Sequence, residues 1–160
     1  RKIAYLGVDN CLVFSADRRN GYQLALTRHG IVPKPEYCVE LPSITAGEDT
    51  PVHALLRSAS RPTAIVVSDD ILALTLERIC TETGLSIPAD LSILSFNNSL
   101  FARLTSPQLT SIDINSCQLG IEAAAQMISH IENPELPATK ILVPHQLIER
   151  DSCARPASHE

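Results

Sequence analysis

The chain has 160 residues, of which 44% are hydrophobic and 19% charged, and its formal net charge is -5. These proportions exclude collagen, coiled-coil and disordered chains, and they supply enough apolar material for one folded core. No apolar run approaches the roughly 18 residues of a membrane span, so we expect a soluble protein with no membrane partner. No cluster of Lys and Arg offers a surface for nucleic acid, so we expect no DNA contact through this part of the protein.

Strands buried on both faces of a parallel sheet appear in a sequence as short, nearly continuous apolar runs. Such runs, with weaker ones near the end, predict strands over 3–8, 37–41, 63–67, 91–96, 109–114, 141–143 and 147–148. Apolar residues at helical spacing, with cap and stop signals, predict helices over 17–29, 50–60, 69–83 and 116–132. The alternation predicts an α/β fold with a doubly wound parallel sheet covered on both faces.

The helix predicted over 69–83 carries more apolar surface than one contact needs. Leu72, Leu76 and Ile79 fall on one side, whereas Ile71 and Leu74 fall on another. Because one stripe can cover the sheet, the second is free, and it predicts the interface of a homodimer.

Polar residues follow three of the predicted strands, at the edge where open parallel sheets bind ligands. They are Asp9, Asn10, Ser15 and Arg18 after the first strand, Ser68, Asp69 and Asp70 after the third, and Asn97 and Asn98 after the fourth. Carboxylates accept hydrogen bonds from vicinal hydroxyls, whereas Arg and Asn donate to hydroxyl and ring oxygens, so the set predicts a sugar or polyol site. The alternative is structural: a helix cap for the Asp pair, a turn for the Asn pair, and a solvated charge for Arg18.

Motifs for dinucleotide, P-loop, hydrolase and zinc-protease chemistry do not occur in the sequence. The cysteines, at 11, 38, 80, 117 and 153, form no C-x-x-C pair, so we expect no metal site and no cofactor. Free thiols in apolar stretches are typical of a reducing compartment, which favours the cytoplasm. We therefore expect a binding protein and not an enzyme.

Several motifs occur together in the order and spacing of a known family. They are Arg18–Leu26 with Gly30-Ile31, Pro62–Ile65, Asp69-Asp70 with Ala73-Leu74, Gly84–Ser92 and Pro107–Ile112. Over residues 3–154 they resemble the effector-binding part of LacI/GalR-family transcriptional regulators. The resemblance implies a type I periplasmic-binding-protein-like fold, with two subdomains hinged around a sugar effector and a DNA-binding helix-turn-helix headpiece ahead of them.

The resemblance also implies a division of the chain. Residues 1–110 would form the second, C-terminal effector-binding subdomain. Residues 111–154 would form the hinge crossing, with a helix and strands that return toward the first subdomain, and 155–160 a tail. The headpiece and most of the first subdomain would lie outside this sequence, so operator DNA would be contacted only through that absent headpiece. The implied function is sugar binding and dimerisation in a repressor of carbohydrate-utilisation genes.

Matching the family position by position assigns roles to single residues. Arg18 matches the effector-binding arginine, Asp69 the polar residue before the family aspartate, and Asn97 the acid after the fourth strand, while Ser15 joins this set from the loop after the first strand. The helix with Ile71, Leu74 and Arg78 is similar to the family's dimer-forming helix.

Two departures bear on the effector. The family commonly has Asn-Asp before the helix and Gly-aromatic-Asp-Asp after the strand, whereas this chain has Asp69-Asp70 and Ser95-Phe96-Asn97-Asn98. The second motif is similar to regulators of maltose and related α-glucosides.

Two other functions fit the same fold. A periplasmic sugar-binding receptor would carry a signal peptide, and the free cysteines count against it. A sugar-modifying enzyme would turn over the bound sugar, and no motif favours it.

Overall fold

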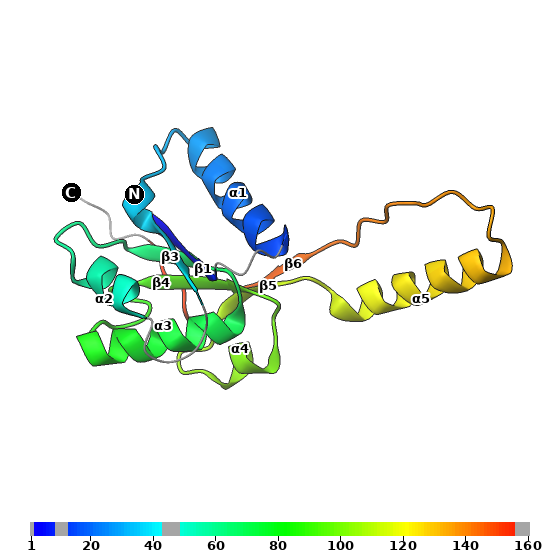
Figure 1. Ribbon diagram of the computed structural model, residues 1–160. Coiled ribbons are helices and arrows are strands. Elements are labelled where there is room, and N and C mark those ends of the chain that lie inside the picture. Colours follow the sequence, from blue (N-terminus) through cyan, green and yellow to red (C-terminus); the bar gives the residue numbers. More distant parts are fainter. Residues whose placement is uncertain (1, 9–12, 43–48, 156–160) are drawn as a thin grey trace.

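The computed structural model describes residues 2–8, 13–42 and 49–155, and Figure 1 shows a sheet with helices on both faces and a projecting arm. The strands are β1 (Ile3–Val8), β2 (Cys38–Leu41), β3 (Ala64–Val67), β4 (Ser92–Phe96), β5 (Thr110–Asp113) and β6 (Gln146–Ile148). The helices are α1 (Val13–Arg28), α2 (Thr50–Arg57), α3 (Asp70–Thr83), α4 (Leu100–Leu104) and α5 (Ser116–Glu132), with a 3-10 turn, η1, at Pro35–Tyr37.

The six-stranded sheet has the order β2-β1-β3-β4-β5-β6. β1 to β5 pair in parallel, whereas β6 runs antiparallel to β5, with Leu147 opposite Ile112. The doubly wound α/β fold is therefore confirmed, with one antiparallel edge strand added. The strand order reverses between β1 and β3, which is where open sheets of this kind bind ligands.

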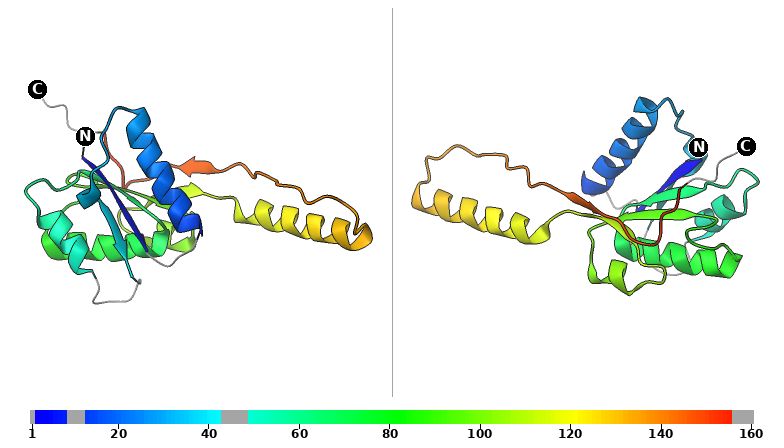
Figure 2. Two further views of the ribbon diagram at one scale, coloured as in Figure 1. Left: turned by 45° about the horizontal axis from the view of Figure 1, so that its top comes forward. Right: turned by 180° about the vertical axis from the view of Figure 1, so that it is seen from behind.

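The main core lies between the sheet and the helices α2, α3 and α4, on the face opposite α1 (Figures 1 and 2). Leu72, Leu76 and Ile79 of α3 are fully buried in it, as their spacing predicts. Gly84 ends α3 in the left-handed conformation, with φ 73, and its N–H donates to the carbonyls of Cys80 and Thr81. This is the usual role of glycine at a helix C-terminus.

A smaller cluster fixes α1 to the other face of the sheet. The rings of Tyr5 and Tyr22 lie 5.6 Å apart, and the Tyr22 hydroxyl donates to the Ile3 carbonyl at 2.8 Å. A Cβ on Gly7 would lie 2.7 Å from Cε1 of the Tyr5 ring. Glycine at this position therefore leaves space for the Tyr5 ring, which packs against Tyr22 of α1.

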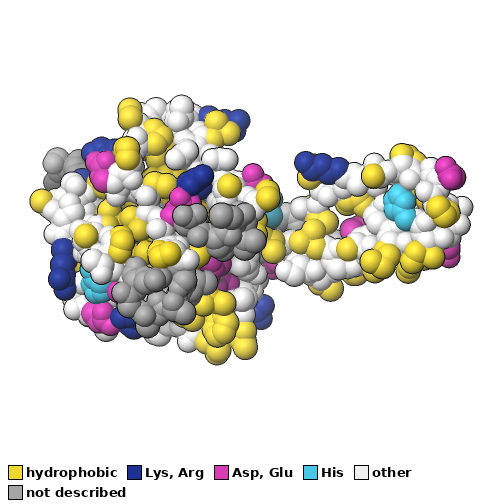
Figure 3. Space-filling view, viewed as in Figure 1, with side chains coloured by type: hydrophobic (Ala, Val, Ile, Leu, Met, Phe, Trp, Pro, Cys, Tyr) yellow, Lys and Arg dark blue, Asp and Glu magenta, His cyan; other side chains and the backbone are white. Residues whose placement is uncertain are grey.

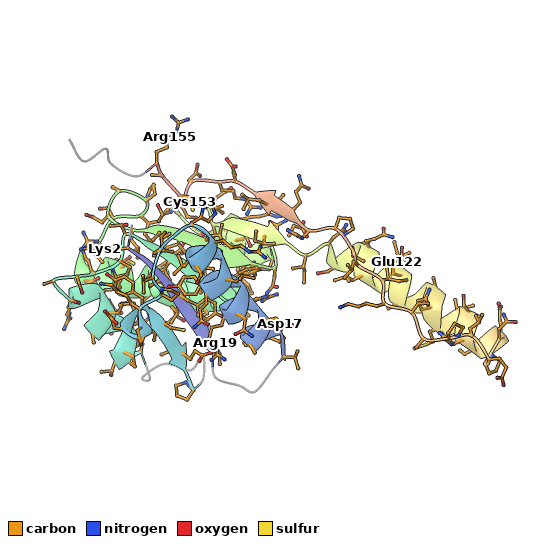
Figure 4. The ribbon with its side chains drawn as sticks, turned by 90° about the horizontal axis from the view of Figure 1, so that it is seen from above. Lys2, Asp17, Arg19, Glu122, Cys153 and Arg155 are labelled. Carbon is orange, nitrogen blue, oxygen red and sulfur yellow. The ribbon has the colours of Figure 1, made fainter. Side chains whose placement is uncertain are left out.

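The arm consists of α5 and the segment that returns to β6, and it extends away from the sheet in all views (Figures 1, 2 and 4). Glu122, labelled in Figure 4, lies on the arm, whereas Cys153 lies beside the sheet. No residue of α5 is buried. Its exposed apolar side chains are Leu119, Ile121, Met127, Ile128 and Ile131.

Three predicted elements differ from the structure by three residues or more, and one α-helix of the structure lies outside the predicted ranges. α1 begins at Val13 and not at residue 17, because residues 13–16 carry no cap signal yet continue the helix, and α2 ends at Arg57 before residue 60. Residues 141–143 form no strand, since this apolar run has no neighbouring strand to pair with. α4 was not predicted, because a five-residue helix is too short to show periodicity.

Asp9, Asn10, Cys11 and most of the predicted tail lie outside the described residues. Among the described residues, no helix combines the length and the apolar composition that crossing a membrane requires.

Candidate functional site

Arg18 connects the ends of two strands at the carboxyl edge of the sheet. It projects from α1, and its Nη1 donates to the carbonyl of Ser68, the residue directly after β3. Its Nη2 donates to Oδ1 of Asn97, the residue directly after β4, at 3.0 Å. One guanidinium thus brings α1, β3 and β4 together beside the point where the strand order reverses.

Two aromatic rings hold the Arg18 guanidinium between them. Its Cζ lies 5.0 Å from the ring centroid of Phe14 and 4.6 Å from that of Phe96, within the range of cation–π attraction. Burial lowers the pKa of Arg18, and the charge of Asp69 opposes that effect. Arginine remains protonated at neutral pH, and it has five N–H donors, so donors remain for a ligand oxygen.

Asp69 and Asp70 are adjacent but serve different parts of the protein. Asp69 caps α3, because its Oδ1 accepts from the Leu72 N–H at 2.8 Å, and it remains partly exposed at the sheet edge. The Asp70 carboxylate is buried and accepts from the hydroxyls of Ser95 and Ser111 and from the Ser99 N–H. The pair therefore does not form a catalytic carboxylate dyad, and Asp70 joins α3 to β4 and β5.

Asn97 and Asn98 form a left-handed turn after β4, with φ values of 97° and 47°. Asparagine tolerates this region better than most residues do. The Asn97 N–H donates to the Ile112 carbonyl at 2.8 Å, and the Asn98 N–H donates to the Ser111 hydroxyl at 3.0 Å. The turn is therefore fixed to β5, and it presents the Asn97 side chain to Arg18.

A cavity of about 280 Å³ opens at this edge and is lined by Phe14, Ser15, Asp69, Asn97 and Phe101, among others. Its volume lies near the lower end of the roughly 300–1,000 Å³ typical of ligand pockets, so it fits a small ligand or one end of a larger one. Arg18 does not line this cavity but lines a larger hollow of about 1070 Å³ under α1, in which the polar groups Ser15, Asp69 and Asn97 are absent. The converging polar groups favour the smaller cavity as the binding site.

The structure brings the predicted site residues together at one edge. Ser15, Asp69 and Asn97 line one cavity, and Arg18 bonds directly to Asn97. Asp69 also performs the structural role considered for it, since it caps a helix. Among the described residues, no cluster of His, Cys, Asp and Glu is arranged to hold a metal ion.

Sequence reasoning missed the aromatic pair around Arg18. A signal was available for Phe14, which lies one helical turn before Arg18 at the i, i+4 spacing that brings side chains together. Phe96 gave no such signal, because it reads as an ordinary apolar strand residue.

The residues expected at a dimer interface lie together on α3. Ile71 is exposed and Leu74 is half-buried, while Arg78 forms ion pairs within its own chain, with Asp49 and Glu82. α4 adds an exposed set that the sequence analysis missed, and Figure 3 shows hydrophobic side chains gathered where Figure 1 places this helix. The exposed residues of α4 include Leu100, Phe101 and Leu104.

Comparison with known proteins gives consistent matches. A family model described as a periplasmic binding protein-like domain matches residues 1–153. The chain is 33% identical to the ribose operon repressor of Haemophilus influenzae, covering 74% of this chain and 36% of that protein. It is 31% identical to the HTH-type transcriptional repressor PurR of Yersinia pestis, covering 86% of this chain and 40% of that protein. The chain therefore spans less than half the length of these relatives.

A solved structure agrees with these matches. It is a sugar-binding transcriptional regulator of the LacI family from Escherichia coli, complexed with phosphate. The TM-score is 0.83 at 26% identity, and the match covers 97% of this chain and 55% of that one.

Proposed function

Because the chain belongs to the periplasmic binding protein-like domain family, we propose that it is the effector-binding part of a LacI/GalR-type transcriptional repressor. The two curated relatives are transcriptional repressors, and the solved neighbour is a transcriptional regulator. These matches support a regulator over both a transport receptor and an enzyme.

The effector in this proposal is a sugar, bound at the carboxyl edge by Arg18, Asp69, Asn97 and Ser15. The observation that carries it is the meeting of Arg18 and Asn97 beside the cavity, with the Asp69 carboxylate in the same wall. Guanidinium and amide donors beside a carboxylate acceptor suit neighbouring hydroxyls, and exposed Phe14 offers a ring face for the apolar side of a sugar. The names of the ribose operon repressor and of the sugar-binding regulator support this class. Within it, we propose maltose or a related α-glucoside, on the Ser95–Asn98 motif.

Operator DNA is contacted, in this proposal, by a helix-turn-helix headpiece outside the present sequence, and the protein acts in the cytoplasm where that DNA lies. The HTH-type name of PurR supports the headpiece. We keep residues 1–110 as the effector-binding subdomain and 111–154 as the crossing. The sugar controls DNA binding only if it binds one arrangement of the two hinged subdomains more tightly than the other. In this proposal the sugar therefore contacts both subdomains across the cleft.

The protein forms a homodimer through α3 and α4. Ile71 and Leu74 on α3 and the exposed residues of α4 offer the same surface to a second copy, as a two-fold interface requires. An apolar surface of this kind needs a partner to exclude water from it.

Isothermal titration calorimetry on the full-length protein tests the function, with maltose, trehalose, glucose and ribose as titrants. Binding of at least one sugar, together with a sugar-dependent change in affinity for DNA upstream of its own gene, is the expected result. If no sugar binds and DNA affinity never changes, the proposed function is wrong.

A further inference from the structure

The turn after β4 has a second residue, Asn98, whose side chain has different partners from that of Asn97. Asn97 accepts from Arg18 in the crevice. The Asn98 amide instead donates through Nδ2 to Oδ2 of Asp113 at 2.9 Å, and its Oδ1 accepts from Nη2 of Arg150. Both functional ends of the Asn98 side chain are therefore engaged by charged groups, and such hydrogen bonds are stronger than neutral ones.

Asp113 is the last residue of β5, and Arg150 lies two residues after β6, so both are close to the two strands that connect the arm to the sheet. Asp113 ends β5, and its other oxygen, Oδ1, accepts from the Asn115 N–H at 2.7 Å. Asn115, with φ 55°, is the N-cap residue directly before α5. One carboxylate therefore holds both the turn and the start of the outgoing helix.

Arg150 lies two residues after β6, where the returning chain has reached the sheet. Its Nη1 donates to the Leu109 carbonyl at 2.6 Å, and its backbone N–H donates to the Thr110 hydroxyl at 3.0 Å. Arg150 thereby ties the returning segment to the start of β5 as well as to Asn98. In Figures 1 and 2, β5 and β6 are the connections between the arm and the sheet.

A continuous set of contacts therefore runs from the crevice to the arm. Arg18 contacts Asn97, the peptide chain leads to Asn98, and Asn98 contacts Asp113 at the end of β5 and Arg150 just after β6. A displacement of the turn moves Asn98 and, through its two hydrogen bonds, Asp113 and Arg150, because rigid, hydrogen-bonded groups move together.

We propose that Asn98 is a positioning residue that fastens the end of β5 and the segment just after β6 to the turn holding Arg18, so that a change in the crevice reaches the strands that connect to the arm. This inference rests on the proposed function in one respect, namely that a bound sugar causes the change in the crevice. The fastening itself exists without ligand and can be measured without one.

Hydrogen–deuterium exchange of the ligand-free, full-length protein tests this role with a matched pair, Asn98→Gly and Asn97→Gly. Glycine tolerates positive φ, so each variant removes a side chain without straining the turn. For Asn98→Gly we expect exchange to accelerate about 10-fold or more in residues 110–115 and 146–150, since hydrogen bonds to charged groups are lost. Residues 3–8 and 64–67, in the centre of the sheet, should be unchanged.

Asn97→Gly should leave exchange in the connecting strands near the native rate, because it removes only the contact with Arg18. Asn98→Asp should accelerate exchange in residues 110–115 more than in 146–150, since it keeps the acceptor for Arg150 but places a carboxylate against that of Asp113. Equal exchange in the two glycine variants, or acceleration spread equally over the whole sheet, would overturn the proposal. A failure to bind any sugar would refute the proposed function and leave these exchange results standing.

Discussion

Arg18 and Asn97, which are 79 residues apart in the sequence, meet through a 3.0 Å hydrogen bond between the guanidinium Nη2 and the amide Oδ1. The same guanidinium reaches the Ser68 carbonyl and lies between two aromatic rings. Because its position is fixed from several sides, its remaining donors need no reordering when a ligand arrives. Such preorganisation reduces the entropic cost of binding.

Arg18→Lys should therefore weaken sugar binding by about 10-fold or more, although it preserves the charge. Lysine has no planar fork, so it cannot contact Ser68 and Asn97 together while lying between the rings. Titration calorimetry with the sugar that binds the native protein measures the change. Arg19→Lys is the control, since Arg19 pairs with Glu40 and makes no contact with Ser68 or Asn97 among the hydrogen bonds of the described residues. Equal affinities of Arg18→Lys and native protein would contradict the assignment.

Asp70→Asn should lower the free energy of unfolding by about 1–3 kcal/mol, because an amide nitrogen replaces a buried acceptor. The native carboxylate accepts from Ser95, Ser111 and the Ser99 N–H, and the last donor cannot reorient. Urea denaturation gives the difference. Asp69→Asn is a matched control on the neighbouring residue, since asparagine caps a helix as well as aspartate does. A similar loss of unfolding free energy in both variants would show that the buried hydrogen bonds of Asp70 contribute no more to stability than the helix cap of Asp69.

The strand and helix order was predictable because each buried strand has a continuous apolar run and each long helix its own spacing. The polar residues of the crevice were also predictable, since parallel strands place their carboxyl ends at one edge. No local pattern showed that adjacent residues have different partners. Asp69 caps α3, whereas the Asp70 side chain is buried and contacts β4 and β5. Likewise Asn97 faces Arg18, whereas Asn98 joins Asp113 and Arg150, groups distant in sequence. These roles depend on tertiary contacts and on positive φ values.

Gly7→Ala should destabilise the protein by about 1–3 kcal/mol, because the added methyl group overlaps the Tyr5 ring and displaces it. Tyr5 packs against Tyr22, so the loss should loosen α1. Gly21→Ala is the matched control. Apart from its chain neighbours and the backbone of its own helix, no described atom lies within 4 Å of a Cβ at Gly21, and alanine should stabilise the helix there by about 0.5–1 kcal/mol. Thermal unfolding distinguishes the two, and equal melting temperatures would contradict the steric argument.

Glu77 should make the folded state less stable as pH rises. Burial raises its pKa to about 7 from the ordinary 4.5. Between these pH values the folded protein binds more protons than the unfolded chain, so stability falls from pH 4.5 to pH 7 and stays lower above it.

Glu77→Gln should remove this part of the pH dependence and raise the melting temperature more at pH 8 than at pH 5. Differential scanning calorimetry at both pH values measures it. The argument fails if the substitution changes stability equally at both.

Leu74→Glu and Leu104→Glu should each shift the full-length protein from dimer toward monomer, because a carboxylate would be buried against the second copy. Leu74 lies half-buried on α3, and Leu104 is 71% exposed on α4, so neither change opens the core. Leu24→Glu is the control, since Leu24 is half exposed on α1, on the opposite face of the sheet. Sedimentation equilibrium reports the masses. If Leu104→Glu dissociates the dimer and Leu74→Glu does not, the interface is centred on α4, whereas unchanged mass in both variants places the dimer contact elsewhere.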